Sequence, residues 1–236
     1  TVLFCLLPRG TVNGGLTVYT KELDQIAERN GFSIHMYADD TQLYIEFNPL
    51  SQDFSTIEDR IIICFQEIKM WMNQMKLKLN QDKTEALVVQ SKYNSSPYTL
   101  DSVQLSTTGE SIKASPKVKS LGVLFDQFLT FEDQVNAIIN CCNIHLRNLC
   151  VIGSKLSYEL KRQLIHCLIF SKLDYCNGLL YGLPDFLMKK LQKVQNACVR
   201  FLFGRKVIKK WARITPFLKK AHFPVSYTHL TLPTIE

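Results

Sequence analysis

The sequence lacks several features that mark specialised classes of protein. None of its apolar runs approaches the roughly 18 residues needed to span a membrane. The opening run at residues 2–7 ends at Pro8 and has no basic residue before it, so it makes a poor signal peptide. No internal repeat is present. We therefore expect a globular chain with no membrane partner, and its 46% apolar and 21% charged content is ordinary for that class.

Paired cysteines are also missing, although the chain has eight cysteines. No C-x-x-C pair occurs, and the nearest approach to metal-ligand spacing is Cys142 with His145, followed by Cys150. Cys142 continues the apolar stripe of a helical pattern, so we expect a small buried hydrophobe there in preference to a zinc ligand. Reduced thiols, an intracellular protein and no disulfide-linked partner are the expectation.

Acidic residues are scarce in one part of the chain. Residues 151–220 contain 15 Lys and Arg but 3 Asp and Glu, a net charge of +12, whereas residues 1–150 contain 13 and 17, a net of −4. Such a basic region is typical of a surface that binds polyanions. The alternative interpretation is a solvated helix face without a partner.

An acidic pair, Asp39-Asp40, lies between two stretches of alternating polarity. Residues 33–37 alternate before it, and residues 42–47 alternate after it, with Leu43, Ile45 and Phe47 on one face. Alternation on both sides of a short polar break predicts a β-hairpin with both acids at or beside its tip. The pair is either an ordinary solvated turn or a site where a hard cation such as Mg²⁺ relieves the repulsion between the carboxylates.

Farther along, the hydrophobic pattern changes from strands to helices. A helix is expected from Asp53 or Ser55 to about residue 76, then a strand at 85–90, a loop or weak hairpin at 91–117, and strand character at 118–125 around Gly122. Three helices follow, one closed by Gly153, one capped by Ser157 and one with Pro184 in its first turn. The four apolar stripes are Ile57, Ile61, Phe65, Ile68, Met72 and Met75; Val135, Ile138, Ile139, Cys142, Leu146 and Leu149; Leu160, Leu164, Cys167 and Leu168; and Leu187, Leu191, Val194, Cys198 and Phe201 or Leu202. The expected fold class is therefore α+β.

Several motifs in order resemble the reverse transcriptases of non-LTR (LINE-type) retrotransposons. The stretch YADDTQLY, residues 37–44, resembles the family's YADD hairpin almost letter for letter. Further segments similar to family motifs are LKLNQDKTE at 77–85, LGVLFD at 121–126, LDYCN at 173–177, LYGLP at 180–184 and LQKVQN at 191–196. The resemblance runs from about residue 8 to residue 225.

The resemblance implies a division of the chain into parts. Residues 1–125 would be a partial polymerase palm of antiparallel strands and helices, 126–205 an all-helical, thumb-like bundle, and 206–225 a basic segment after the thumb. Residues 226–236 resemble a translated sequencing-library adaptor, so we expect a non-native tail. Because the chain begins at Thr1, we also expect natural residues before it to be missing.

The resemblance also implies roles for individual residues. Asp39 and Asp40 would be catalytic ligands of Mg²⁺ or Mn²⁺, and Lys83 would be a catalytic lysine near the departing pyrophosphate. Contacts with the nucleotide, template or primer would come from Gly10, Tyr37, Ala38, Asn80, Leu121 and Gly122. We expect Lys189, Lys190 and Lys193, on one side of the third helix, to contact nucleic acid. The implied partners are an RNA template, a DNA primer and deoxynucleotide triphosphates, in the nucleus or a cytoplasmic ribonucleoprotein.

Two departures from the family pattern bear on activity. The family has a further metal-binding Asp on a strand well upstream, but the acids before Asp39 are Glu22, Asp24 and Glu28, all in a helix-like stretch. Arg9 also stands where the family has glutamine. We expect the parent to be an RNA-directed DNA polymerase and the isolated chain to be inactive. The alternatives are an inactive nucleic-acid-binding remnant and a decayed reading frame with no folded product.

Overall fold

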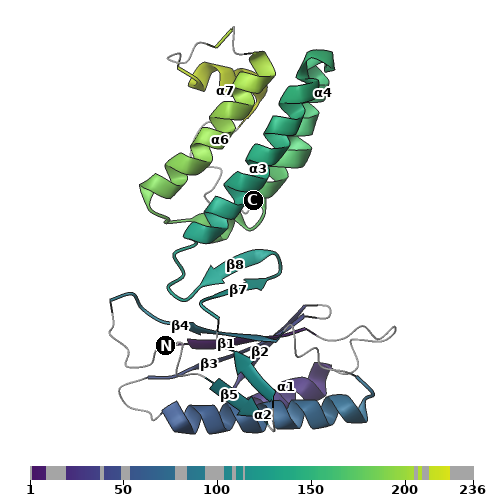
Figure 1. Ribbon diagram of the computed structural model, residues 1–236, viewed down its shortest axis with the longest axis vertical. Helices are drawn as coiled ribbons and strands as arrows, with labels where there is room; N and C mark the ends of the chain where they lie inside the picture. Colours follow the sequence, from purple (N-terminus) through teal and green to yellow (C-terminus); the bar gives the residue numbers. More distant parts are fainter. Residues whose placement is uncertain are drawn as a thin grey trace, which may run out of the picture. The chain divides into compact units, whose positions relative to one another are not determined.

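The computed structural model describes residues 2–8, 20–37, 40–48, 54–77, 84–93, 104–107, 110–113, 115–204, 207–208 and 213–223. The chain forms two compact units, Thr1–Leu129 and Thr130–Glu236. The first unit contains strands and helices, and the described residues of the second contain helices joined by turns (Figure 1). The fold class is α+β, as predicted. The sequence placed the boundary between residues 125 and 126, whereas the compact units divide between Leu129 and Thr130.

A four-stranded antiparallel sheet forms the centre of the first unit. Its strands lie in the order β2-β3-β1-β4, with bounds β1 Val2–Pro8, β2 Ser33–Tyr37, β3 Asp40–Glu46 and β4 Glu85–Val89. The predicted hairpin and the strand at 85–90 are confirmed. The sequence analysis did not predict β1, which pairs with both β3 and β4. A short apolar run ended by a proline is a typical central strand.

Two helices cover one face of this sheet, α1 (Thr20–Arg29) and α2 (Phe54–Gln74) (Figure 1). The predicted stripe of α2 is confirmed, because five of its six residues are buried and Met75 packs against the same core. On the sheet side, the core includes the alternating residues Leu43, Ile45 and Phe47 and, from β4, Ala86 and Val88. Burial of one face of each strand fixes the strand register, since a slip of one residue would expose every one of these side chains.

A second layer lies on the other face of the sheet. The hairpin of β7 (Lys117–Ser120) and β8 (Val123–Asp126) packs there, because Leu87 of β4 contacts Val118 of β7 in a small separate cluster. The strand character predicted for residues 118–125 is confirmed, and the chain reverses within it, at Leu121 and Gly122. A further hairpin, β5 (Gln104–Thr107) with β6 (Glu110–Lys113), lies within the segment predicted as a loop or weak hairpin.

Helices of the second unit surround a core of their own. The helices are α3 (Glu132–Ile152), α4 (Tyr158–Ile165), α5 (Ser171–Asp174), α6 (Asp185–Phe203) and α7 (Thr215–Ala221), with 3₁₀ turns at Gly153–Lys155 and Asn177–Leu180 and a π-helical segment at His166–Phe170. The predicted stripes of α3 and α6 are confirmed. Ser157 caps α4, as predicted, because its side chain accepts a hydrogen bond from the Leu160 amide at 3.3 Å.

The predicted inner face of α4 is partly wrong. Leu160 and Cys167 are exposed, whereas Ile165, Ile169 and Phe170 are buried. The π-helical segment His166–Phe170 interrupts the regular 3.6-residue period, so the stripe read from the sequence does not continue through it.

One described segment, Glu132–Lys155, is long and apolar enough by length and composition to cross a membrane. The sequence analysis missed it because polar residues interrupt its apolar runs. Val135, Ile138, Cys142 and Leu149 of this segment lie in the core of the helical unit. The absence of a membrane partner remains a prediction.

Candidate functional site

Asp40 opens strand β3 at the tip of the predicted hairpin. It lies directly opposite Tyr37 of β2, so the strands are joined by Ala38 and Asp39 alone. Those two residues, together with Gly10, Asn80 and Lys83, lie outside the described residues. Asp40 is half-buried, and 68% of Tyr37 is exposed. The predicted position of one acid at the hairpin tip is confirmed, and that of Asp39 remains a prediction.

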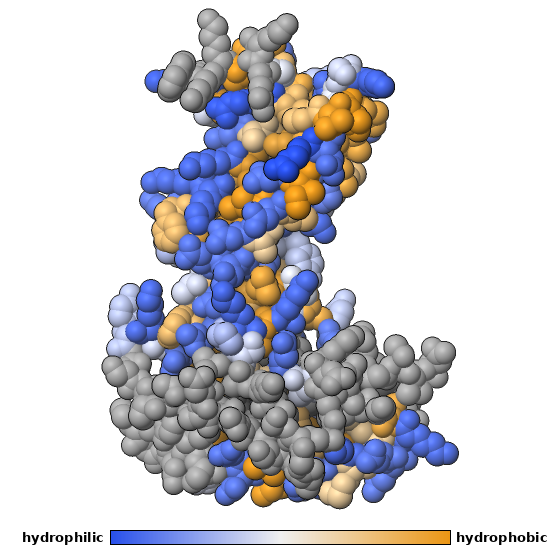
Figure 2. Space-filling view, viewed as in Figure 1, coloured by the Kyte–Doolittle hydropathy of each residue, from blue (hydrophilic) through white to orange (hydrophobic). Residues whose placement is uncertain are grey.

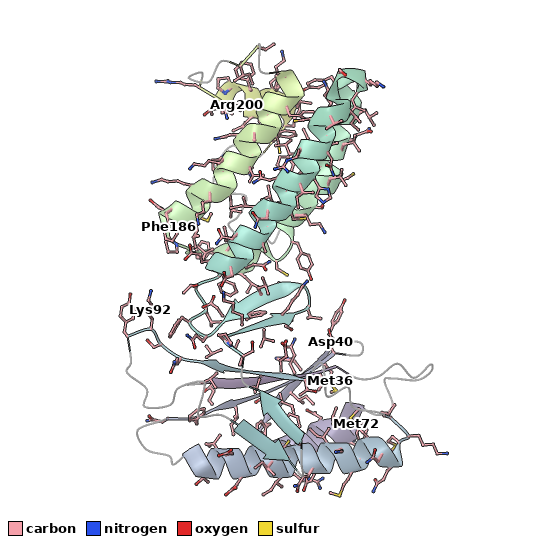
Figure 3. The ribbon with its side chains drawn as sticks, in the orientation of Figure 1. Met36, Asp40, Met72, Lys92, Phe186 and Arg200 are labelled. Carbon is pink, nitrogen blue, oxygen red and sulfur yellow. The ribbon has the colours of Figure 1, made fainter. Side chains whose placement is uncertain are left out.

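The strand pleat places Asp40 on the face of the sheet that α1 and α2 leave open. Successive side chains of a strand point to opposite faces, and Leu43 and Ile45 point into the core under those helices. Asp40, Gln42 and Tyr44 therefore share the other face. In Figure 3, Asp40 lies at the end of the hairpin, whereas Met36 of β2 lies toward the helices.

A layer of polar and aromatic side chains orders this open face. The ring of Tyr44 stacks on that of His35 with 5.5 Å between centroids, and the Tyr44 hydroxyl and His35 Nε2 share a 3.3 Å hydrogen bond. The amide of Gln42 donates to Ser120 Oγ at 2.6 Å. This bond connects β3, two residues after Asp40, to the β7–β8 hairpin. The sequence analysis missed it because the partners are 78 residues apart.

The turn of the β7–β8 hairpin consists of Leu121 and Gly122. Ser120 pairs with Val123 across it, and both turn residues have positive φ, +46° and +84°. Two residues of positive φ are the pattern of a type I′ turn, which matches the twist of the paired strands. Because Ser120 is bonded to Gln42, the turn lies on the same face of the sheet as Asp40. Two segments that the sequence analysis singled out separately are thus on one face.

The donor set at the hairpin tip fits a hard divalent cation. Two carboxylates adjacent in sequence, one of them half-buried on an open face, supply oxygen ligands, and Mg²⁺ ordinarily keeps water in its other positions. On its other side, Asp40 faces Pro8 of β1, whose sequence VLFCLLP contains no carboxylate. Among the described residues, no group of three His, Cys, Asp or Glu side chains converges on one point. The predicted set therefore includes Asp39 and Asp40 of this hairpin and no carboxylate from the neighbouring strand β1.

The three predicted nucleic-acid-binding lysines lie on α6 of the helical unit, but one of them is engaged. Lys190 Nζ lies 3.5 Å from Glu132 Oε1, donates to Asn136 Oδ1 at 3.2 Å and lies 5.6 Å from the Phe186 ring centroid. Lys190 is therefore not a free cation, because α3 compensates its charge. Lys189 and Lys193 are exposed.

A shallow groove accompanies these lysines. It has a volume of about 330 Å³ and is lined by Lys190, Lys193 and Val194 of α6 and Asn136, Ile139 and Asn143 of α3. Figure 2 shows hydrophilic side chains along α6 beside an apolar strip over α3. Ammonium and amide groups above an apolar floor suit an anionic ligand with an apolar part.

Each unit has buried thiols: Cys64 in the first unit, and Cys142 and Cys198 in the second. Burial raises the pKa of Cys142 to about 11 and that of Cys64 to about 12, and it also raises the pKa of Cys198. A thiol protonated at neutral pH is a weak metal ligand. The prediction that Cys142 behaves as a small hydrophobe is confirmed by its complete burial.

Comparisons of the chain with protein-family models, with curated proteins and with solved structures return no match.

Proposed function

We propose that this chain is the palm and thumb fragment of an RNA-directed DNA polymerase of a non-LTR retrotransposon. The observation that carries the proposal is Asp40, which lies at a hairpin tip on the sheet face opposite α1 and α2, with the Leu121–Gly122 turn on the same face. The sequence motifs around both segments resemble that family. The first unit would be the palm and the helical unit the thumb. Template RNA, primer DNA and deoxynucleotide triphosphates are the proposed partners, inside the cell.

The proposed chemistry is attack of a primer 3′-hydroxyl on the α-phosphorus of a nucleotide. Asp39 and Asp40 would hold Mg²⁺ or Mn²⁺, which, when bound, stabilises charge on phosphate oxygens. The half-buried position of Asp40 favours a fixed carboxylate over a freely moving one. Gly122, without a Cβ, permits close approach of a primer backbone, and Lys83 would neutralise charge near the pyrophosphate.

The isolated chain is proposed to be inactive. The resemblance implies a third carboxylate on a strand upstream of the hairpin, and β1, which neighbours β3, has none in its sequence. Two carboxylates would bind a divalent ion more weakly and leave its position less defined, because ligand number sets both affinity and geometry.

A second candidate function is nucleic-acid binding without catalysis. The net charge of +12 on residues 151–220 and the exposed Lys189 and Lys193 favour it. Electrostatic attraction to phosphates requires no metal site and no third carboxylate.

Primer extension tests the proposed function. The reading frame would be extended upstream of Thr1 until it contains a further Asp on an apolar strand, and the product assayed on an RNA template with a DNA primer and Mg²⁺. We expect synthesis by the extended chain and none by residues 1–225. Asp39→Asn or Asp40→Asn in the extended chain should lower the rate by at least about 100-fold, because each removes a metal ligand.

Glu46→Gln is the matched control, since Glu46 is an exposed acid on the same strand and face as Asp40. Its rate should stay within about twofold of the parent rate. Robust synthesis by residues 1–225 alone would contradict the proposal that the isolated chain is inactive for want of a third carboxylate. An extended chain that binds template and primer but synthesises nothing would overturn the proposed polymerase activity. Nucleic-acid binding without catalysis would then be the remaining candidate function.

A further inference from the structure

Aromatic rings gather at one end of the helical unit, where α4 begins, α6 ends and α7 lies. Phe203 of α6 contacts Tyr158 of α4 at 5.7 Å and Phe217 of α7 at 5.4 Å between ring centroids. Phe201 lies against Gly153, at the end of α3, so closely that a Cβ on this glycine would come within 2.8 Å of the ring. Figure 3 labels Arg200 at this end of α6 and Phe186 at the opposite end, near Lys190. This cluster is therefore separate from the groove described above.

Two lysines are held over these rings. Lys161 Nζ lies 5.6 Å from the Phe201 centroid, and Lys220 Nζ lies 6.0 Å from that of Phe203. A cation over a ring face is attracted by the ring quadrupole. The aromatic cluster thus positions two ammonium groups from α4 and α7, so that an anion binding to them meets side chains that have already lost part of their rotational freedom.

The charge around the cluster is almost entirely positive. The described cations of this end are Lys155, Lys161, Arg162, Arg200, Arg213, Lys219 and Lys220. Among the same described segments, the acid is Glu159, which is engaged by Arg162 at 3.2 Å. Repulsion among so many like charges opposes folding and is relieved by a polyanion.

Tyr158 adds a second kind of contact. Tyr158 is 39% exposed, and its ring is tilted by 59° on that of Phe203. Partly exposed rings between cations are a common surface for unpaired bases, since every base has a π face, whereas the phosphates reach the flanking lysines. An anionic membrane would also engage the lysines, but it offers no base to stack on the Tyr158 ring.

We infer that this end of the helical unit, the Tyr158–Lys161–Lys220 surface, is a binding site for single-stranded nucleic acid. It is independent of the metal site and does not require polymerase activity. Bases stack on Tyr158, and backbone phosphates pair with Lys161, Lys219 and Lys220. Because the contacts are to phosphates and a base face, binding discriminates little between sequences.

Fluorescence anisotropy with the whole chain and a labelled 20-nucleotide RNA of mixed sequence tests this inference. Lys161→Gln/Lys220→Gln should weaken binding by about tenfold at 0.1 M salt and make the slope of log K against log salt shallower by about 1.4, because each phosphate contact on a single strand contributes about 0.7. Tyr158→Ala should weaken binding of the single strand by about 5- to 100-fold and leave binding of a duplex of the same sequence nearly unchanged.

Lys92→Gln/Lys172→Gln is the matched control, since it removes two exposed charges elsewhere (Figure 3 labels Lys92) and should leave affinity within about twofold. Lys219→Gln, an exposed lysine that makes no ring contact among those described, provides a variant that should weaken binding without disturbing the fold. Equal losses in the control and test variants would overturn the inference. So would tighter binding to phosphatidylserine vesicles than to RNA, or a Tyr158→Ala effect of the same size on duplex and single strand. Primer extension is not measured, so failure here leaves the polymerase proposal standing.

Discussion

His166 lies where three rings meet in the helical unit. Its ring makes edge contacts with Phe170 at 5.0 Å and Phe223 at 5.3 Å, and those two phenyl rings are 4.7 Å apart. Burial lowers the pKa of His166, the nearby Arg162 lowers it further, and Asp174 acts in the opposite direction. Folding therefore favours the neutral imidazole more than the unfolded chain does, and the His166 ring contacts Phe223, after α7.

Protonation of His166 should destabilise the fold in acid. Since the folded pKa is below the unfolded value of about 6.5, stability is complete above that pH and declines as the pH falls through it, when the unfolded chain takes up the proton first. Urea unfolding between pH 8 and pH 5 should show this decline in the wild type and a smaller one in His166→Gln.

His145→Gln is the comparison variant, because His145 is a half-buried histidine of the same unit. It should keep the wild-type decline. An identical pH dependence in His166→Gln and the wild type would contradict the assignment of this loss of stability to protonation of His166.

Some single-residue positions could be predicted from the sequence, and some side-chain contacts could not. The position of Asp40 followed from local alternation, because a strand of period two fixes the face of every side chain once one buried residue is known. The engagement of Lys190 with Glu132 did not follow, since the two residues are 58 positions apart and meet only when α3 packs against α6. The cations over Phe201 and Phe203 were missed for the same reason.

At the scale of elements, the β7–β8 turn combines strain with a proposed function. Leu121 has a φ of +46°, and a left-handed backbone at a residue other than glycine costs about 1–2 kcal/mol. Strain of this kind persists where surrounding contacts impose it, and it gathers at functional sites. Here the two-residue turn between β7 and β8 imposes the positive φ of Leu121, and its primer contact remains a prediction.

Replacing the two turn residues should change stability in opposite directions. Leu121→Asn should raise the free energy of unfolding by about 1 kcal/mol, since asparagine favours this position of a type I′ turn. Gly122→Ala should lower it by about 1–2 kcal/mol, because a Cβ is disfavoured at its φ of +84°. Urea unfolding of the three chains measures both changes. Destabilisation by Leu121→Asn would show that contacts of the leucine outweigh its backbone strain.

Elements with a regular hydrophobic period were predicted from the sequence. Features that depend on packing against other elements were not. The stripe of α2 and the β2–β3 hairpin follow from local spacing alone. The π-helical segment His166–Phe170 and the reversal at Gly122 depend on packing that local spacing does not contain. β1 carried a usable signal, an apolar run closed by Pro8, but its central place between β3 and β4 is a long-range property.

At the scale of the whole molecule, two compact units with separate cores carry opposite charge. The boundary at Leu129 lies near the change from a net −4 over residues 1–150 to +12 over residues 151–220. Under the proposal, the acidic unit supplies carboxylates for a metal and the basic unit attracts the polyanion. The claim that matters most concerns the acidic unit: neighbouring carboxylates at a hairpin tip bind a divalent ion.

Paramagnetic broadening by Mn²⁺, mapped by NMR over the whole chain, tests that claim most directly, because it detects even weak binding by an incomplete ligand set. We predict that the amide signals of Tyr37, Asp40 and Thr41 broaden first and that Asp39→Asn/Asp40→Asn abolishes this. The chain has two other adjacent acidic pairs, Glu58-Asp59 and Glu132-Asp133. The latter is an internal control, since Lys190 already engages Glu132. Broadening that begins at Glu132-Asp133, or that persists at the hairpin in the double variant, would contradict the account.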